Sequence, residues 1–343
     1  MNIEKYADAI KNCRFCFMCR HLSGIGNVRF TEADTPRVRA AMIYGVTLHP
    51  EELSNKDFID TLYRSDLSAA CRYHCVSHFD ENGLNIAART DIVNAGFAPD
   101  YVKKIADELK KNAKWTVKGS GSVLYLADRY SVEAGIPKVF DKLMKKAKVS
   151  YQTATGGCIG KGLKVLGFAK EAKAAAEKFA KTVKDSKAKT IVVSNPAAYD
   201  ALVNDFKEFG IKLGVKVMHT SEYLLSLKLK FKNAGAVYYL ESDFLKNYND
   251  NYKFPRALLA AMKANIKQFG TNNEESYTCG EGAVVLPCID ESLVKLLAEY
   301  IAARADNPAK DVIVVASPYT KLYLSRYTKL KVKTLEELAA ENI

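Results

Sequence analysis

Three cysteines near the start of the chain have a spacing that suits a metal centre. Cys13, Cys16 and Cys19 are separated from one another by two residues each. Thiolates at this spacing can wrap a loop around a cubic iron–sulfur cluster and supply three of its four ligands. Zinc is the alternative, although structural zinc sites usually combine two paired Cys-x2-Cys units. The spacing therefore favours an iron–sulfur cluster whose fourth ligand comes from elsewhere in the chain.

The fourth ligand is predicted from ferredoxin-type proteins, in which the last cysteine of each motif binds the cluster of the other motif. Cys75 stands where it would complete the cluster of Cys13, Cys16 and Cys19, and Cys71 is the less favoured substitute. A second cluster would need four thiolates, of which only Cys71 is present. The other three positions are occupied by Ser23, Ser65 and Ser68. The sequence therefore predicts one 4Fe–4S cluster and the loss of a second as a unit.

The composition is that of a globular protein with more than one domain. The chain has 343 residues, 48% hydrophobic and 26% charged, which argues against disordered, fibrous and coiled-coil chains. No apolar run approaches the roughly 18 residues needed to span a bilayer. The first 20 residues lack the uninterrupted apolar stretch of a signal peptide, so we expect a cytoplasmic protein. In that compartment, eight cysteines indicate metal or redox chemistry before structural disulfides.

The positive charge is concentrated in one part of the chain. The net charge is +12, and residues 101–190 hold 21 Lys or Arg against 8 Asp or Glu. The rest of the chain has 30 basic and 31 acidic residues. This segment can attract an acidic partner or surface, or it can simply keep its helices in water, as in the lysine-rich run 169–189. We find no aromatic interleaving or recognisable module of a nucleic-acid reader, and we expect no nucleic-acid partner.

The pattern of residues predicts helices first and alternating strands and helices later. Residues up to about 100 read as helical, with Pro36 in the first turn of a helix. The segment 104–121, lysine-rich and ending in Gly119-Ser120-Gly121, is predicted to be a linker. After it, short β-rich runs alternate with helical runs, and we expect strands at 123–127, 149–155, 190–195, 236–240 and near 311. This alternation is typical of α/β units with a mostly parallel sheet.

The α/β texture occurs twice. The run TIVVSNPAAYDAL (190–202) has a counterpart in DVIVVASPYTKLYL (311–324), and GGCIGKG near residue 158 has one in YTCGEGAV near residue 279. The offset of roughly 120 residues is the size of a domain. We therefore expect an α + α/β protein with a helical domain at 1–105 and two repeated α/β domains at 120–230 and 231–343.

These motifs together resemble the iron–sulfur subunits of glycolate-oxidase type, which are related to heterodisulfide reductase. ADTPRVRAAMI (33–43) is similar to the segment after that family's first cysteine motif, and LSAACRYHC (67–75) to its second, with Val76 in place of a proline. GGCIGKGLKVLGF (156–168) and SYTCGEG (276–282) resemble the family's Cys-Cys-Gly, or CCG, motifs. SNPAAY (194–199) and ASPYTK (316–321) resemble its closing Cys-Pro-x-Cys motifs. The resemblance implies a ferredoxin-like helical domain followed by two CCG-type domains.

The repeats depart from the family at the positions that would bind metal. The family holds a paired-cubane cluster with five cysteines per repeat, and this chain keeps one in each. The five positions of the first repeat are Arg129, Cys158, Ile159, Asn195 and Ala198. Those of the second are Asp243, Thr278, Cys279, Ser317 and Thr320. We therefore expect both repeats to be scaffolds, with inert repacking of the vacated sites favoured over binding of a small molecule.

Weaker signals have plainer interpretations. The run 156–162 lacks the spacing and the hydroxyl residue of a phosphate loop and is expected to be a strand-to-helix turn. Cys158, Cys279 and Cys288 are expected to be buried thiols. His74 and His78 flank Cys75 and are expected to have ordinary packing or surface roles, with tuning or ligation of the cluster as the alternative.

The resemblance implies an electron-transfer subunit, not itself catalytic, with one 4Fe–4S cluster. Its partner would be a flavoprotein dehydrogenase that carries FAD, an electron carrier, or both, and would dock through an acidic surface. The expected location is the cytoplasm, or the inner face of the membrane within a complex. One alternative is a divergent heterodisulfide or thiol reductase with Cys158 or Cys279 reactive. Another is a non-redox scaffold with a structural metal site.

Overall fold

The first third of the chain is built from helices. The computed structural model describes residues 1–13, 16–267 and 277–343. In the described part, all strands follow residue 114. The helices before it are η1 (Asn2–Tyr6), α1 (Ala7–Asn12), α2 (Gly24–Arg29), η2 (Glu32–Asp34), α3 (Pro36–Leu48), η3 (Pro50–Ser54), α4 (Lys56–Tyr63), η4 (Ala70–Tyr73), α5 (Glu81–Asn94) and α6 (Asp100–Lys111). Pro36 occupies the first turn of α3, as predicted.

The linker predicted at 104–121 is wrong. Residues up to Lys111 belong to α6, whose buried face includes Val102 and Ile105. Strand β1 (Trp115–Gly119) then forms the edge of a sheet, paired antiparallel with β3 (Gln152–Gly156). The lysines that suggested a linker lie on the outer face of an amphipathic helix, where their charge does not oppose packing.

The first sheet has five strands in the order β1-β3-β2-β4-β5. Apart from β1, its neighbouring strands are parallel. The remaining strands are β2 (Val123–Ala127), β4 (Thr190–Val193) and β5 (Lys216–His219). The helices between and after them are α7 (Arg129–Glu133), α8 (Ile136–Ala147), α9 (Lys161–Val165), α10 (Ala169–Ser186), α11 (Pro196–Asp200), η5 (Ala201–Asp205), α12 (Phe206–Glu208) and α13 (Thr220–Ser226).

The second sheet repeats this topology. Its order is β7-β6-β8-β9, which matches β3-β2-β4-β5, and its strands are all parallel. The strands are β6 (Ala236–Leu240), β7 (Asn265–Ile266), β8 (Val312–Val315) and β9 (Lys331–Thr334). The helices are η6 (Asp243–Tyr248), α14 (Lys253–Ala261), η8 (Glu281–Ala283), α15 (Leu286–Ile289), α16 (Glu291–Ala302), α17 (Pro318–Tyr327) and α18 (Leu335–Glu341). The mixed α + α/β class with mostly parallel sheets is thus confirmed.

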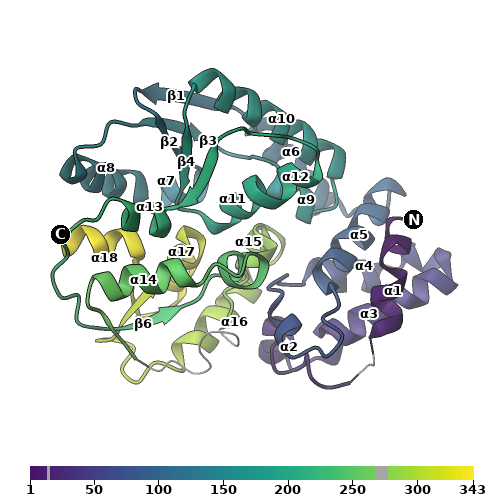
Figure 1. The fold of residues 1–343 in the computed structure, drawn as a ribbon. Helices are drawn as coiled ribbons and strands as arrows, with labels where there is room; N and C mark the ends of the chain where they lie inside the picture. Colours follow the sequence, from purple (N-terminus) through teal and green to yellow (C-terminus); the bar gives the residue numbers. More distant parts are fainter. Residues whose placement is uncertain (14–15, 268–276) are drawn as a thin grey trace.

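The two sheets share a hydrophobic core that lies between them. Alternate residues of β2 face opposite ways, so Val123 and Tyr125 join this shared core while Leu124 and Leu126 pack beneath α10. Helix α8 packs on α18, and α13 packs on α14, so each repeat contributes equivalent helices to the contact (Figure 1). Strands covered on both faces explain why β2, β4, β6 and β8 are continuous apolar runs.

The N-terminal helices pack against both repeats (Figure 1). Helix α2 packs on α16, and α5 and α6 pack on α9. The fully buried guanidinium of Arg89 donates hydrogen bonds to the carbonyl oxygens of Val165, at 2.7 Å, and Leu62, at 2.6 Å. Arg89 therefore links α5 to the first repeat. No helix among the described residues is long and apolar enough to cross a bilayer.

Candidate functional site

The first cysteine motif lies between α1 and α2. Cys13 follows α1 and packs, partly buried, against the main hydrophobic core. Cys19 is buried and Cys16 is exposed. Residues 14 and 15 lie outside the described residues. The motif therefore bends so that its three thiols differ in their access to solvent.

The environment of Cys19 suits a metal-bound thiolate in one respect. Burial raises the pKa of the Cys19 thiol to about 11, whereas a hydrogen bond from the backbone amide of Arg37 opposes this rise. Arg37 lies in the first turn of α3. Amide hydrogen bonds to a sulfur favour its charged form, and the thiolate is the form that binds metals. If Cys19 binds iron as a thiolate, the Arg37 amide would therefore already be placed to donate a hydrogen bond to its sulfur.

The second cysteine motif lies against the first. Cys71 is buried in η4, and the amide of partly buried Cys75 donates to the Cys71 carbonyl at 3.1 Å. The Ser77 hydroxyl donates to the carbonyl of Asn12, the residue before Cys13, at 2.8 Å. This hydrogen bond joins the loop after Cys75 to the end of α1.

Cys71 lies deeper than Cys75 and beside a carboxylate. Burial raises the pKa of the Cys71 thiol, and the negative charges of Glu81 and Cys19 raise it further. A thiol in such surroundings gives up its proton less readily than one near solvent. Burial and the nearby negative charges thus oppose ionisation of the Cys71 thiol.

The two histidines beside Cys75 have different surroundings. His78 is exposed, and its Nδ1 lies 3.0 Å from the Arg72 carbonyl oxygen. His74 is partly buried, with its ring 4.7 Å from that of His21, edge to face. These contacts match the packing and surface roles expected for the two residues.

The donors of the described residues form no compact set around one point. Within residues 1–13, 16–267 and 277–343, no group of three or more His, Cys, Asp or Glu side chains could hold one metal ion. A zinc ion would need its thiolates about 2.3 Å from one centre. In a cubic cluster each thiolate binds a different iron, so the sulfurs stand further apart. All eight cysteines are free thiols, which leaves the predicted ligands available.

The positions that a second cluster would need are occupied by three serines, and the hydroxyl groups of two of them are hydrogen-bonded to the backbone. Ser23, Ser65 and Ser68 are all buried. The Ser23 hydroxyl donates to the Asp34 carbonyl at 2.9 Å, and the Ser65 hydroxyl accepts from the Leu67 amide at 3.3 Å. Short hydroxyls satisfied by nearby backbone groups leave no set of ligands at this place.

A buried carboxylate joins the segments that carry these serines. Asp66 accepts hydrogen bonds from the amides of Ile25, at 3.2 Å, and Ser68, at 3.1 Å. Burial raises the pKa of the Asp66 carboxyl. Arg39 and Glu81 form a buried ion pair at 2.5 Å, and Arg39 acts electrostatically on Asp66. Polar and charged side chains thus occupy the space between the two motifs.

The five positions of the first repeat at which the family binds metal, four of them without cysteine here, lie around one cavity of about 70 Å³. They come from the ends of β2, β3 and β4. The side-chain amide of Asn195 donates to the buried carboxylate of Asp128 and accepts from the Ala197 amide at 3.0 Å. Small-molecule pockets typically measure about 300–1,000 Å³. The cavity is therefore a packing remnant by size.

The vacated positions of the second repeat are closed. Asp243, Thr278, Cys279, Ser317 and Thr320 are all buried. Thr278 donates to Asp243 at 2.6 Å, and Ser317 hydrogen-bonds the buried carboxyl of Glu281. Burial raises the pKa of Asp243, and it raises that of Glu281 to about 7. Ser276, the first residue of the SYTCGEG motif, lies outside the described residues.

The remaining cysteines correct one prediction. Cys158 and Cys279 are buried, as expected, and burial raises the pKa of both thiols. Cys288 is exposed, so its prediction as a buried thiol is wrong. Cys288 lies in the short helix α15. Its side chain is next to Arg129 and lines the small cavity.

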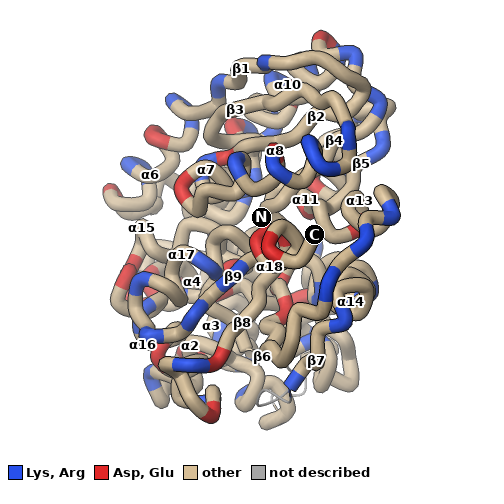
Figure 2. Tube along the Cα trace, turned by 90° about the vertical axis from the view of Figure 1, so that its left-hand side faces the viewer, with Lys and Arg blue, Asp and Glu red and all other residues tan. Residues whose placement is uncertain are grey.

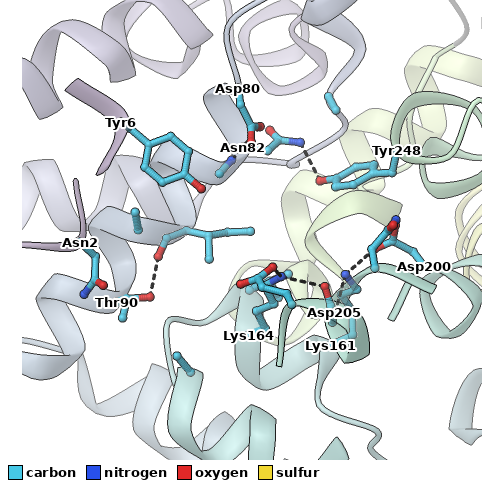
Figure 3. A pocket seen from close by; sticks show the side chains of 18 of the residues that line it. Asn2, Tyr6, Asp80, Asn82, Thr90, Lys161, Lys164, Asp200, Asp205 and Tyr248 are labelled. Carbon is cyan, nitrogen blue, oxygen red and sulfur yellow. Dashed lines mark hydrogen bonds and ion pairs between the residues drawn. The ribbon is translucent and has the colours of Figure 1, made fainter. Parts of the chain in front are cut away.

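Sequence reasoning missed a larger cavity between the N-terminal helices and the repeats. This central cavity, of about 440 Å³, is lined from η1, α5, α9, η5 and η6 (Figure 3). Lys161, which the pattern placed in a turn, is buried there in ion pairs with Asp200 and Asp205. Its lining residues come from many elements that are far apart in the sequence, among them η4 with Arg72, so no local spacing could have revealed it.

Comparisons with known proteins agree with the cysteine chemistry at a coarse level. No protein-family model matches the chain. The chain is 28% identical over 183 residues to the Bacillus subtilis (strain 168) protein named probable iron-sulfur-binding oxidoreductase FadF. The match covers 49% of this chain and 25% of the length of the relative. This similarity supports a relationship to iron–sulfur oxidoreductases.

A solved structure gives a weaker comparison. Glutamate racemase isoform RacE1 from Bacillus anthracis matches with 14% identity over 65% of this chain and 80% of the racemase. The TM-score of 0.32 is too low to relate the two folds.

Proposed function

We propose that this chain is an electron-transfer protein that carries one 4Fe–4S cluster on Cys13, Cys16, Cys19 and Cys75. The observation that carries the proposal is the contact between the two cysteine motifs through Ser77 and Asn12. The similarity to an iron–sulfur-binding oxidoreductase supports the choice of metal. The cluster would supply one-electron transfer when bound.

The residues of the chain would hold the cluster at the edge of the N-terminal helices. The exposed position of Cys16 would leave one side open to a redox partner, while buried Cys19 and the main core would shield the other side. The Arg37 amide would donate to the Cys19 thiolate. Exposure and hydrogen bonds to the sulfurs are among the properties that set the potential of such a centre.

The two alternatives have less support. A thiol reductase would need a reactive thiolate, whereas Cys158 and Cys279 are buried thiols whose pKa values are raised. A structural zinc site would need ligands around one point, and the described residues hold no such group.

Metal analysis after anaerobic reconstitution tests the proposal. We expect about four irons and four sulfides per chain, and an absorption that dithionite bleaches and oxidant restores. Cys75→Ser should lose the cluster, whereas Cys71→Ser should keep it. Cys288→Ser, an exposed cysteine outside both motifs, is the matched control and should keep full iron. Retention of the cluster by Cys75→Ser with its loss in Cys71→Ser would refute the ligand assignment.

The basic segment is proposed to receive an acidic partner, such as a flavoprotein dehydrogenase subunit with FAD or a small electron carrier. Lys and Arg positions recur along α8 and at the β5 side of the first sheet (Figure 2). A hollow beside α10 is lined by four lysines and no acidic residue. These lysines are Lys181, Lys184, Lys187 and Lys212. Such a surface speeds the association of oppositely charged proteins.

Copurification from the native source tests the partner. We expect a flavoprotein to accompany the chain, with an association rate that falls steeply as salt is raised. Reversal of the lysine charges in the hollow should slow association without loss of iron. A native complex without flavin or another redox centre would refute this part of the proposal.

A further inference from the structure

The central cavity has the size and composition of a ligand site. Its volume of about 440 Å³ lies within the range of about 300–1,000 Å³ that is typical of small-molecule pockets. Four aromatic side chains line it, together with four basic and four acidic ones. The aromatic residues are Tyr6, Phe209, Phe244 and Tyr248. None of the positions at which the family binds metal in the two repeats lines this cavity. Lys161 lines both this cavity and the small cavity of the first repeat.

One wall of the cavity carries charged side chains that are paired with one another. Lys164 Nζ lies 2.8 Å from Asp205 and 2.6 Å from Glu208. Lys161 pairs with Asp200 and with the second carboxylate oxygen of Asp205. Figure 3 shows the two lysines of α9 together with Asp200 and Asp205. Each charged side chain of this wall thus has a partner of opposite sign, although the three carboxylates outnumber the two lysines by one.

Other residues that line the cavity carry polar groups with free hydrogen-bonding capacity. Within the part of the chain that the structure describes, the guanidinium of Arg72 makes no ion pair or hydrogen bond, and neither does the Tyr6 hydroxyl. Asp80 accepts from the Gly83 amide through Oδ1, at 3.0 Å, which leaves Oδ2 available. Burial and the charges of Asp80 and Glu208 raise the pKa of Tyr6 to about 12.

The missing side chain of Gly83 keeps these groups close together. A Cβ atom at Gly83 would lie 2.4 Å from Asp80 Oδ2 and 2.5 Å from the Tyr6 hydroxyl. Any larger residue would push the carboxylate and the hydroxyl apart. Asp80 and Tyr6 therefore form a compact acceptor and donor pair on the wall of the cavity (Figure 3).

We propose that the central cavity binds a small zwitterion of the amino-acid or dipeptide class. The free guanidinium of Arg72 matches a carboxylate, which it can bind through two parallel hydrogen bonds. The free oxygen of Asp80 accepts from an ammonium group, and the Tyr6 hydroxyl adds a further hydrogen bond. A ligand with both charges leaves neither Arg72 nor Asp80 uncompensated.

Calorimetry on the full chain with three matched compounds tests the proposal. Glycylglycine carries both charges, N-acetylglycine lacks the ammonium group, and glycylglycinamide lacks the carboxylate. We expect glycylglycine to bind about tenfold more tightly than either of the others. Failure of glycylglycine to bind at millimolar concentration, or equal binding of all three compounds, would overturn the proposal.

Two variants assign the charges. Arg72→Gln should bring glycylglycine down to the affinity of glycylglycinamide, and Asp80→Asn should bring it down to that of N-acetylglycine. Asparagine remains an effective N-cap, so Asp80→Asn preserves the start of α5. Lys173→Gln, an exposed change on α10, should bind as the wild type does. If both variants bound glycylglycine as tightly as the wild type, the ligand would bind elsewhere and the proposal would be wrong.

The outcome does not depend on the iron–sulfur proposal. Arg72 follows Cys71 directly, so the iron content of Arg72→Gln is measured in parallel. Unchanged iron with weakened binding supports the ligand site. Weakened binding that appears only in protein that has lost iron would show damage to the cysteine loop and would count against the site.

Discussion

The Nζ atom of Lys161 lies 2.7 Å from Oδ2 of Asp205, and both side chains are almost fully buried beside the central cavity. Lys161 also pairs with Asp200, which accepts hydrogen bonds from Asn204, at 2.7 Å, and Asn249, at 2.9 Å. Burial alone would lower the pKa of Lys161, but the two carboxylates raise it above its ordinary value. Lys161 is therefore paired with two buried acids, of which Asp205 is shared with Lys164.

Removal of this cation is expected to destabilise the protein strongly. Lys161→Met keeps much of the side-chain volume but leaves Asp200 without a counter-charge, and Asp205 with Lys164 alone. Breaking a buried pair in this way costs about 3–5 kcal/mol. Urea unfolding, followed by circular dichroism, measures the change in the free energy of unfolding.

An exposed lysine gives the matched control. Lys145 pairs with Asp141 at 2.6 Å, but its side chain is 77% exposed. Lys145→Met should cost less than about 1 kcal/mol, because exposed pairs contribute little. Equal losses in the two variants would contradict the role given to burial at Lys161.

The second prediction concerns His219, which is buried in its neutral form. Its Nδ1 accepts from the Ser221 amide at 3.2 Å, and its Nε2 faces the Ser194 carbonyl oxygen at 3.3 Å. Burial lowers the pKa of His219 to about 4, against 6.5 for a free histidine. Between these values the unfolded chain binds a proton that the folded chain does not bind.

Stability should therefore fall as the pH is lowered from about 6.5 to 4. At about pH 4, His219 should lower the free energy of unfolding by about 3 kcal/mol, since each pKa unit corresponds to about 1.4 kcal/mol. His219→Asn retains a side-chain acceptor for the start of α13 but cannot titrate. The urea midpoint of His219→Asn, measured at several pH values, should approach the midpoint of the wild type as the pH is lowered. A constant difference across this range would contradict the prediction.

The sequence predicted those strands that are buried on both faces. The runs at 123–127 and 236–240 coincide with β2 and β6, because central strands of a parallel sheet are continuously apolar. Strands β5 (Lys216–His219) and β9 (Lys331–Thr334) were not predicted. Each lies at the edge of its sheet and begins with an exposed lysine, so neither carries a continuous apolar run.

One part of the site could likewise be predicted from local sequence, and another part could not. The spacing of Cys13, Cys16 and Cys19 is local, so it can be read without the fold. The central cavity depends on Tyr6 and Lys161, which are brought together only by the packing of α5 on α9. Its chemistry could therefore not be predicted from residue spacing.

The last prediction asks whether the second cluster can be restored. The triple variant Ser23→Cys, Ser65→Cys and Ser68→Cys recreates, with Cys71, the four thiols that such a cluster would need. We expect iron to remain at about four per chain after reconstitution, since Asp66 now joins the segments around Ser23 and Ser68. The buried Arg39–Glu81 pair would also have to be displaced, which makes insertion of a second cluster costly.

Iron and sulfide assays on the triple variant measure the outcome. Addition of Cys13→Ser to it should bring iron close to zero, which shows that the iron present belongs to the first cluster. A rise to about eight irons per chain would instead mean that the serines alone exclude the second cluster and that the buried charges adapt to it.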